Sequence, residues 1–172
     1  MIQLAYQPSH DPFHAMFRLL RLRDGLDLGS IDADVVRILD FFLLHPHRIG
    51  SIRFKQGHAR FRSLAQKYSD RRGYALQPSD RVLFESMAPM HEAATQTLAE
   101  ANAIDASALE RGSISFQKFE IPERLRARIR ELNASEADLL EFLKVLSIEY
   151  PLLGRGGLKD RTNLMEHRYD AV

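Results

Sequence analysis

The chain has 172 residues, of which 45% are hydrophobic and 27% are charged, the usage of an ordinary globular protein of one domain. It contains no cysteine, which excludes disulfides, thiolate zinc sites and cysteine nucleophiles. The net charge of +1 conceals one basic segment, residues 48–72, in which eight Lys and Arg residues stand against Asp70 alone. Such a segment can meet phosphates or an acidic partner.

The start of the chain, MIQLAYQPSHDPF, lacks the basic and apolar regions of a signal peptide. The longest apolar stretches are interrupted by charge and are too short to span a bilayer. We therefore expect a cytoplasmic protein without a membrane partner.

The apolar spacing predicts a first helix over residues 11–22, followed by a break at Gly25. Ser30 is the expected N-cap of a second helix with a wide apolar stripe. This helix should end near His45, because Pro46 disfavours helical geometry in the residue before it.

The middle of the chain alternates short and long elements. A short extended piece is expected at residues 51–54, followed by a helix over 59–68. The longest helical segment covers residues 80–102, and we expect Pro89 to kink it or split it into two helices.

The last third begins with a short helix at residues 107–110. Alternating polar and apolar residues over 113–121 predict a strand or a short hairpin. Helices are expected over 123–132 and 135–150, and the glycine-rich remainder, residues 154–172, is expected to be a loop and a tail.

Three helices followed by a β segment give the element order of a winged helix. We predict a mainly α fold, a helical domain with a winged-helix core and a small β hairpin as its wing. The expected organisation is a single domain, residues 1–172, with an N-terminal helical segment (1–30), the winged-helix core (31–121), C-terminal helices (122–153), and the loop and tail (154–172).

The sequence offers little that indicates catalysis. His45 and His47, with Asp40 nearby, could supply ligands to zinc, but histidine at a helix C-terminus is also favoured by the helix dipole. The segment 154–159 lacks the spacing of a phosphate-binding loop, and no nucleophile elbow is present. We therefore expect no enzyme, no cofactor, no metal and no small-molecule substrate.

The basic segment indicates binding to double-stranded DNA, because Lys and Arg neutralise phosphates and release counterions. A merely solvated face is the alternative interpretation. The candidate DNA contacts are Arg53, Lys55, Arg60, Arg62, Lys67, Arg71 and Arg72. A second basic surface is expected from Arg124, Arg126, Arg128 and Arg130.

Three stretches of the chain, DPFHAMFRLLRL, DVVRILDFFLLHPHRI and GLKDRTNLMEHRYDAV, resemble the middle component of bacterial ABC-three-component systems. These small proteins are encoded between an SMC-like ATPase and an effector, an organisation shared with Lamassu-type anti-phage systems. The resemblance implies a non-catalytic accessory subunit that links the SMC-like ABC ATPase to the effector in defence against phage or plasmid DNA. Both proteins would then be partners of this chain.

The resemblance also implies a role for the terminal motif in subunit contact or in anchoring the tail. A tail packed on its own domain is the alternative. The residues that match this motif are Gly157, Leu158, Lys159, Arg161, Leu164, Met165 and Tyr169. A different class of function, a stand-alone winged-helix transcription regulator, would require a symmetric dimer on a palindromic operator.

Overall fold

Helices dominate the computed structural model, which describes residues 8–72 and 78–166, and they are accompanied by one small sheet. This agrees with the predicted class, mainly α with a small β element. The winged-helix core remains a prediction. Within the described residues, no helix combines the length and the apolar character needed to cross a membrane.

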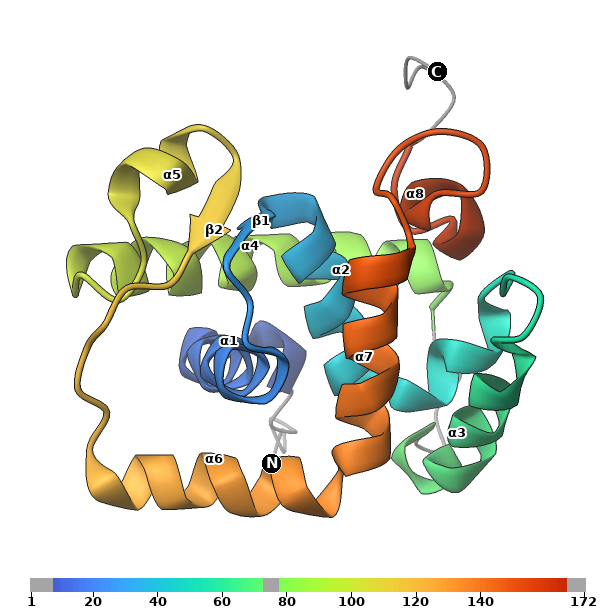
Figure 1. The fold of residues 1–172 in the computed structure, drawn as a ribbon, viewed down its shortest axis with the longest axis horizontal. Helices are drawn as coiled ribbons and strands as arrows, with labels where there is room; N and C mark the ends of the chain where they lie inside the picture. The colour runs from blue at the N-terminus through green and yellow to red at the C-terminus, as the bar shows by residue number, and fades with distance from the viewer. Residues whose placement is uncertain (1–7, 73–77, 167–172) are drawn as a thin grey trace, which may run out of the picture.

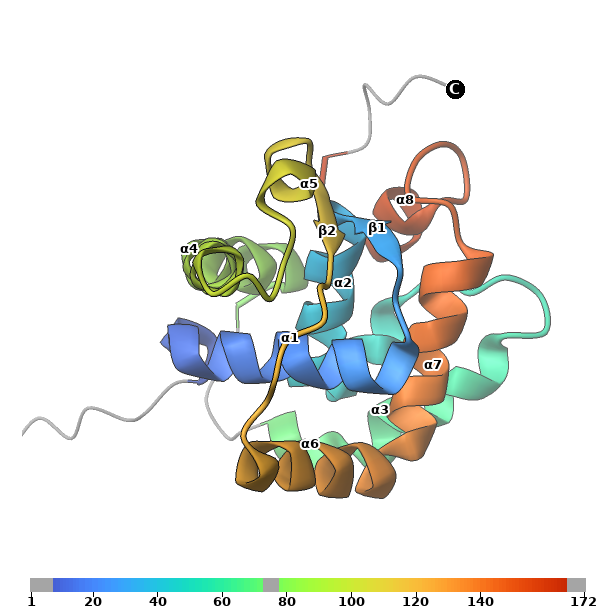
Figure 2. The same cartoon turned by 60° about the vertical axis from the view of Figure 1, so that its left-hand side comes forward.

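Helix α1 (Pro12–Leu26) lies in the middle of the molecule, between α4 (Asp80–Glu100) and α6 (Glu123–Ser135) (Figure 1). Helix α7 (Ala137–Glu149) follows α6 directly and rises away from its end. The same arrangement, seen from another side, places α4 above α1 and α6 below it (Figure 2).

Local chemistry determines where α1 begins, and the helix ends at Leu26, where Asp27 adopts the left-handed conformation of a C-cap. Asp11 caps the helix, since its carboxylate accepts a hydrogen bond from the Phe13 N–H at 2.8 Å. The predicted break at Gly25 is wrong, because the helix continues to Leu26. A Cβ at Gly25 would overlap the side chain of Leu140 of α7, so this glycine allows two helices to approach closely.

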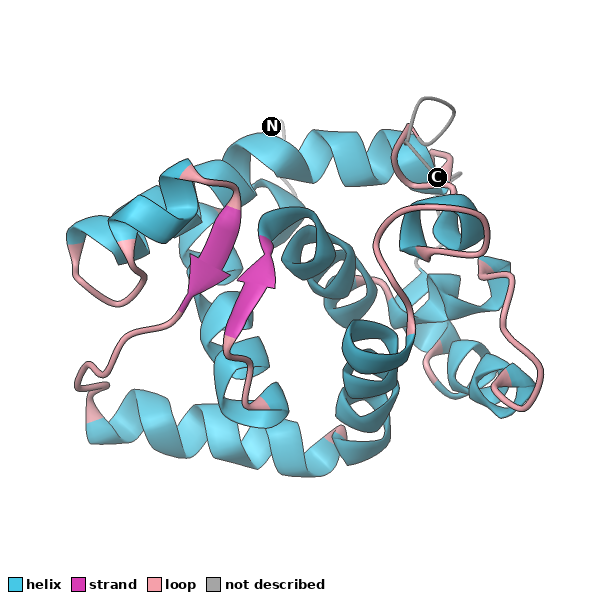
Figure 3. Ribbon diagram, turned by 45° about the horizontal axis from the view of Figure 1, so that its top comes forward, coloured by secondary structure: helices cyan, strands magenta, loops and turns pink. Residues whose placement is uncertain are grey.

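The small sheet joins two strands that are far apart in the sequence. Strand β1 (Ser30–Asp32) pairs antiparallel with β2 (Ser113–Ser115), and Ile31 lies opposite Ile114 (Figure 3). The expected β element is therefore present, but its two strands are far apart in the sequence and are not joined by the short turn of a hairpin. Ile114 is fully buried, and Ile31 supplies the apolar cross-strand neighbour that such a position favours.

Helix α2 (Ala33–Leu44) ends where the sequence predicts, just before His45 and Pro46. Its start differs from the prediction, because Ser30 belongs to β1 and Asp32 is the N-cap. The Asp32 carboxylate accepts a hydrogen bond from the Asp34 N–H at 2.8 Å. Strand pairing thus takes Ser30 away from its expected role.

Helix α4 runs without interruption through Pro89, so the predicted split there is wrong. A proline inside a helix costs about 3 kcal/mol or more, through a lost hydrogen bond and a steric clash. Buried side chains lie on both sides of Pro89, among them Phe84, Met87 and Leu98. Packing of this face against α1 and α2 outweighs the local cost.

The basic segment folds into short helical turns. They are η2 (Pro46–Ser51), η3 (Ala59–Phe61), α3 (Arg62–Lys67) and η4 (Ser69–Arg72). The predicted helix over 59–68 is confirmed as η3 followed by α3, whereas extended geometry begins only at Ile52 because η2 includes Ser51. The rings of Phe54 and Phe61 pack against Phe142 of α7, with centroids 6.1 and 5.3 Å away.

Helix α5 (Ala106–Glu110) precedes β2, and the region after β2 contains α6, α7 and one unexpected helix, α8 (Leu158–Thr162). Residues 158–162 were expected to be loop, and that expectation is wrong. Leu158 is fully buried, and its N–H donates to the Pro151 carbonyl at 2.7 Å. Burial of this side chain holds the turn in place. A 3-10 turn, η1 (Pro8–His10), precedes α1.

Candidate functional site

The basic segment lies beside α7 (Figure 1). Several of its cations face acidic side chains of that helix or of its N-cap residue, Glu136. Arg60 is 3.2 Å from the Glu141 carboxylate. Lys67 pairs with Asp138, and Arg71 pairs with Glu136. These contacts join residues that are 65 to 81 positions apart in the sequence.

Three of the other candidate DNA contacts also interact with side chains of the same domain. Arg53 pairs with Asp160 at 2.7 Å, and the Lys55 ammonium lies 4.4 Å from the centre of the Tyr150 ring. Arg62 lies over the ring of Phe54 at 5.9 Å. Arg72 is exposed at the end of η4.

The ion pairs affect the titration of the groups between α3 and α7. Burial opposes ionisation of Asp138, but hydrogen bonds from Lys67 and Tyr68 outweigh it, so the pKa of this carboxyl is lowered. Burial, together with the hydrogen bond to Asp138, raises the pKa of the Tyr68 hydroxyl. The carboxylate is therefore held in its charged form beside the basic segment.

The self-contacts limit what the basic segment offers to DNA. Exposed ion pairs are each worth about 0–1 kcal/mol and are screened by salt. DNA could displace them, but it would compete with the acidic side chains of α7. Contact with DNA by these seven residues remains a prediction.

The terminal motif is built largely into the domain. Leu158 and Leu164 are buried, and Met165 packs against the core. A Cβ at Gly157 would overlap the Leu153 carbonyl oxygen. Packing of this motif on its own domain is therefore what the geometry favours for these residues.

Two cations of the motif contact distant parts of the chain. The Lys159 ammonium is 3.5 Å from Asp34, and the Arg161 guanidinium donates to the Arg53 carbonyl. Tyr169 lies outside the described residues. Partner contact through the motif stays a prediction for its exposed atoms.

Asp40, which the sequence suggested as a third zinc ligand beside His45 and His47, instead forms a buried ion pair. Asp40 is fully buried and pairs with Arg18 of α1 at 2.6 Å, with His91 of α4 at 3.5 Å. Burial opposes ionisation of Asp40, but the Arg18 guanidinium holds the pKa of this carboxyl well below its usual range. Over residues 8–72 and 78–166, no group of three or more His, Cys, Asp or Glu side chains is arranged to hold a metal ion.

A second buried polar network fixes α1 against α6. The Arg21 guanidinium donates to the Asn133 side chain at 2.9 Å and to Glu136 at 2.8 Å. The Asn133 amide donates in turn to the carboxylate of Asp24 at 3.2 Å. Buried networks with satisfied partners hold elements in one arrangement, so the spacing between α1 and α6 is set.

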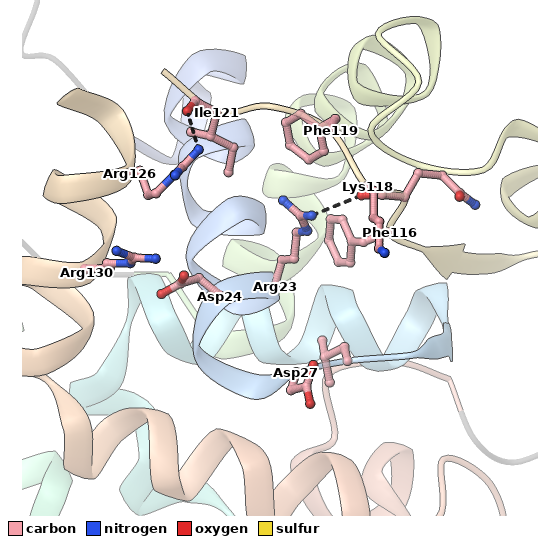
Figure 4. A pocket seen from close by; sticks show the side chains of 11 residues that line it. Arg23, Asp24, Asp27, Phe116, Lys118, Phe119, Ile121, Arg126 and Arg130 are labelled. Atoms are coloured by element: carbon pink, nitrogen blue, oxygen red, sulfur yellow. Dashed lines mark hydrogen bonds between the residues drawn. The ribbon is translucent and has the colours of Figure 1, made fainter. Parts of the chain in front are cut away.

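A cleft of about 450 Å³ opens between these two helices and the segment that connects β2 to α6 (Figure 4). The Arg23 guanidinium lies 4.5 Å from the centre of the Phe119 ring and donates to the Gln117 carbonyl at 3.0 Å. Arg126 of α6 donates to the Ile121 carbonyl at 3.1 Å. Two arginines therefore hold the connecting segment over α1 and shape the cleft.

Cations outnumber anions around the cleft. Its charged lining consists of Arg23, Lys118, Arg126 and Arg130, opposed by Asp24 and Asp27. The expected second basic surface is divided, because Arg126 and Arg130 line the cleft and Arg124 and Arg128 do not. The sequence did not reveal the cleft, since its walls come from three segments and no short motif marks Arg23 or Lys118.

The fold is that of a small helical protein, and its charged surfaces are the basic segment and the cleft. Its described residues contain no cluster of side chains that could hold a metal ion. A family model for ABC-three component (ABC-3C) system Middle Component 5 matches residues 4–170. The chain therefore belongs to this family of ABC-3C middle components. No match was found among the curated proteins or among the solved structures.

Proposed function

We propose that this chain is a non-catalytic accessory subunit that links an SMC-like ABC ATPase to an effector, in a cytoplasmic complex that defends a prokaryote against phage or plasmid DNA. The observation that carries the proposal is the family match over nearly the whole chain. The name of the family implies partners, and a middle component is one of three that work together.

The distribution of exposed surface supports a linking role. The cleft lies between α1 and α6 and has no lining residue from α7, whereas two exposed apolar side chains lie near the C-terminal end of α7. There Ile148 and Leu153 are 70% and 44% exposed. A helix of 13 residues is about 20 Å long at 1.5 Å per residue, so two partners could be held without overlap.

Co-expression with the ATPase and the effector of the same operon, followed by size-exclusion chromatography at moderate salt, tests the proposal. The expected result is a stable complex that contains all three chains. Elution of this chain alone as a dimer that shifts promoter DNA would contradict the proposal and favour the winged-helix regulator.

The proposal includes contact with DNA through the basic segment, and this part has its own test. Asp138→Asn with Glu141→Gln removes the competing carboxylates from Lys67 and Arg60. We expect DNA affinity of the complex to rise by about threefold to tenfold.

The opposite change gives the control for this test. Reversal of charge at Arg60, Arg62 and Lys67 to Glu should weaken the DNA association of the complex without unfolding the chain. Unchanged salt-dependent DNA binding in both sets of variants would remove the basic segment from the DNA interface.

A further inference from the structure

We infer that the cleft between α1 and α6 binds an acidic, partly apolar peptide segment of a protein partner. The inference rests on the proposed function, because it specifies how one partner would be recognised. It assigns a role to residues outside the basic segment and outside the terminal motif.

Uncompensated positive charge is the first observation that supports this inference. Lys118 and Arg130 are exposed, and neither forms an ion pair with any residue in the described ranges. Among the described residues, the acidic partner of Arg126 is Glu123, an exposed side chain at 3.4 Å. Carboxylates of a partner would find open donors here, and charge-assisted hydrogen bonds are the strong ones.

The cleft is also organised before any partner arrives. The guanidinium groups of Arg23 and Arg126 are held by backbone carbonyls, and the buried Arg21–Asn133 network fixes the distance between the walls. Side chains that are already ordered lose little conformational entropy on binding. Such a site favours binding of one specific segment over non-specific electrostatic binding of anions.

The nature of the lining favours a peptide over nucleic acid. Phe116, Phe119 and Ile121 are half-buried around the cleft and offer apolar contacts. Asp24 and Asp27 lie on the α1 side, where they would repel a phosphodiester backbone. Mixed charges around an apolar patch are typical of protein interfaces, and they select a segment that combines acidic and apolar residues.

Charge reversal at Lys118 and Arg130 tests the inference. The variant Lys118→Glu with Arg130→Glu changes the cleft without breaking any ion pair of the described residues. The matched control is Lys144→Glu with Arg124→Glu, which has the same residue types and the same charge change. Both control residues are exposed and lie outside the cleft.

The probe is a fluorescent ten-residue peptide made of glutamates with two phenylalanines, measured by anisotropy beside a ten-nucleotide single-stranded DNA. We expect the cleft variant to bind the peptide about tenfold more weakly than wild type, and the control variant to bind it within about twofold. The inference is overturned if wild type does not bind the peptide, if both variants lose binding equally, or if reversal weakens binding of DNA and not of the peptide.

The co-expressed complex separates failure of this inference from failure of the proposed function. The cleft variant should lose one of the two partner proteins, while the control variant retains both. If all three chains assemble and the cleft variant assembles equally well, the linking function stands and the cleft inference fails. If wild type forms no complex, the proposed function fails, and the peptide-binding measurement alone tests whether the cleft binds an acidic segment.

Discussion

The basic segment carries eight Lys and Arg residues, and most of them contact carboxylates or aromatic rings of the same domain. The cleft carries four cations, and two of them have no ion pair with any residue that the structure describes. The denser cluster in the sequence is thus the less available one in space. A run of charge indicates a potential partner, but the partner can be another part of the same chain. The number of unpaired cations on a shaped surface is the better guide to external binding.

The largest effect should come from Glu136, where the basic segment is joined to α1. This side chain is 9% exposed and pairs with both Arg21 and Arg71. Substitution Glu136→Leu leaves the buried Arg21 guanidinium without its carboxylate, so we expect the free energy of unfolding to fall by about 3–5 kcal/mol. Urea denaturation measures this loss.

The matched control for Glu136 is Glu141→Leu, which removes an exposed partner of Arg60. Its expected loss is about 1 kcal/mol or less. Equal losses in the two variants would show that the attachment of the basic segment does not depend on the buried contact.

Acid should lower the free energy of unfolding through His45, which lies between α2 and η2 at the start of the basic segment. Burial, and then the charges of His47 and Arg48, lower the pKa of His45 to about 4. The unfolded chain protonates this group near pH 6.5, so the neutral form contributes stability above pH 6.5 that is lost as the pH falls towards 4. The loss should be on the order of 3 kcal/mol.

Urea denaturation at several pH values measures the contribution of His45, and the variant His45→Gln should flatten the slope between pH 6.5 and 4. The range above pH 6.5 serves as the control, because wild type and His45→Gln should there show the same slope. A slope that is unchanged in His45→Gln would contradict the assignment.

A smaller loss of stability is expected where the basic segment contacts residues 151–161. The Arg53 N–H donates to the Arg161 carbonyl at 3.1 Å, and Gly157 permits the tight path of that loop. Gly157→Ala forces the Leu153 carbonyl to move and should cost about 1–3 kcal/mol in thermal unfolding. Gly29→Ala, where nothing lies within 4 Å of the new Cβ, should stay within about 0.5 kcal/mol of wild type.

The smallest effect belongs to the exposed ion pairs themselves. Arg60→Gln and Lys67→Gln should each lower the free energy of unfolding by no more than about 1 kcal/mol. Because exposed charges are screened, the difference from wild type should vanish in about 1 M salt. A loss that persists at high salt would mean that these side chains contribute by packing and not by charge.

Much of the fold could be predicted because its signals are local. The start of α1 near residue 11, the stop before Pro46 and the apolar stripes of α1 and α2 depend on signals within a few residues. The resemblance to middle components rests on the same stretches. Where these signals failed, at Gly25 and Pro89, packing between helices outweighed a local preference.

The sequence by itself determined the helical class, the place of the basic segment and the family of the chain, because periodicity, composition and motif are properties of neighbouring residues. Only the tertiary structure decided that β2 pairs with β1, that Lys67 meets Asp138, and that Arg23 and Arg130 border one cleft. Pairing energies depend on distance in space, and the folded chain brings together residues about 70 to 110 positions apart.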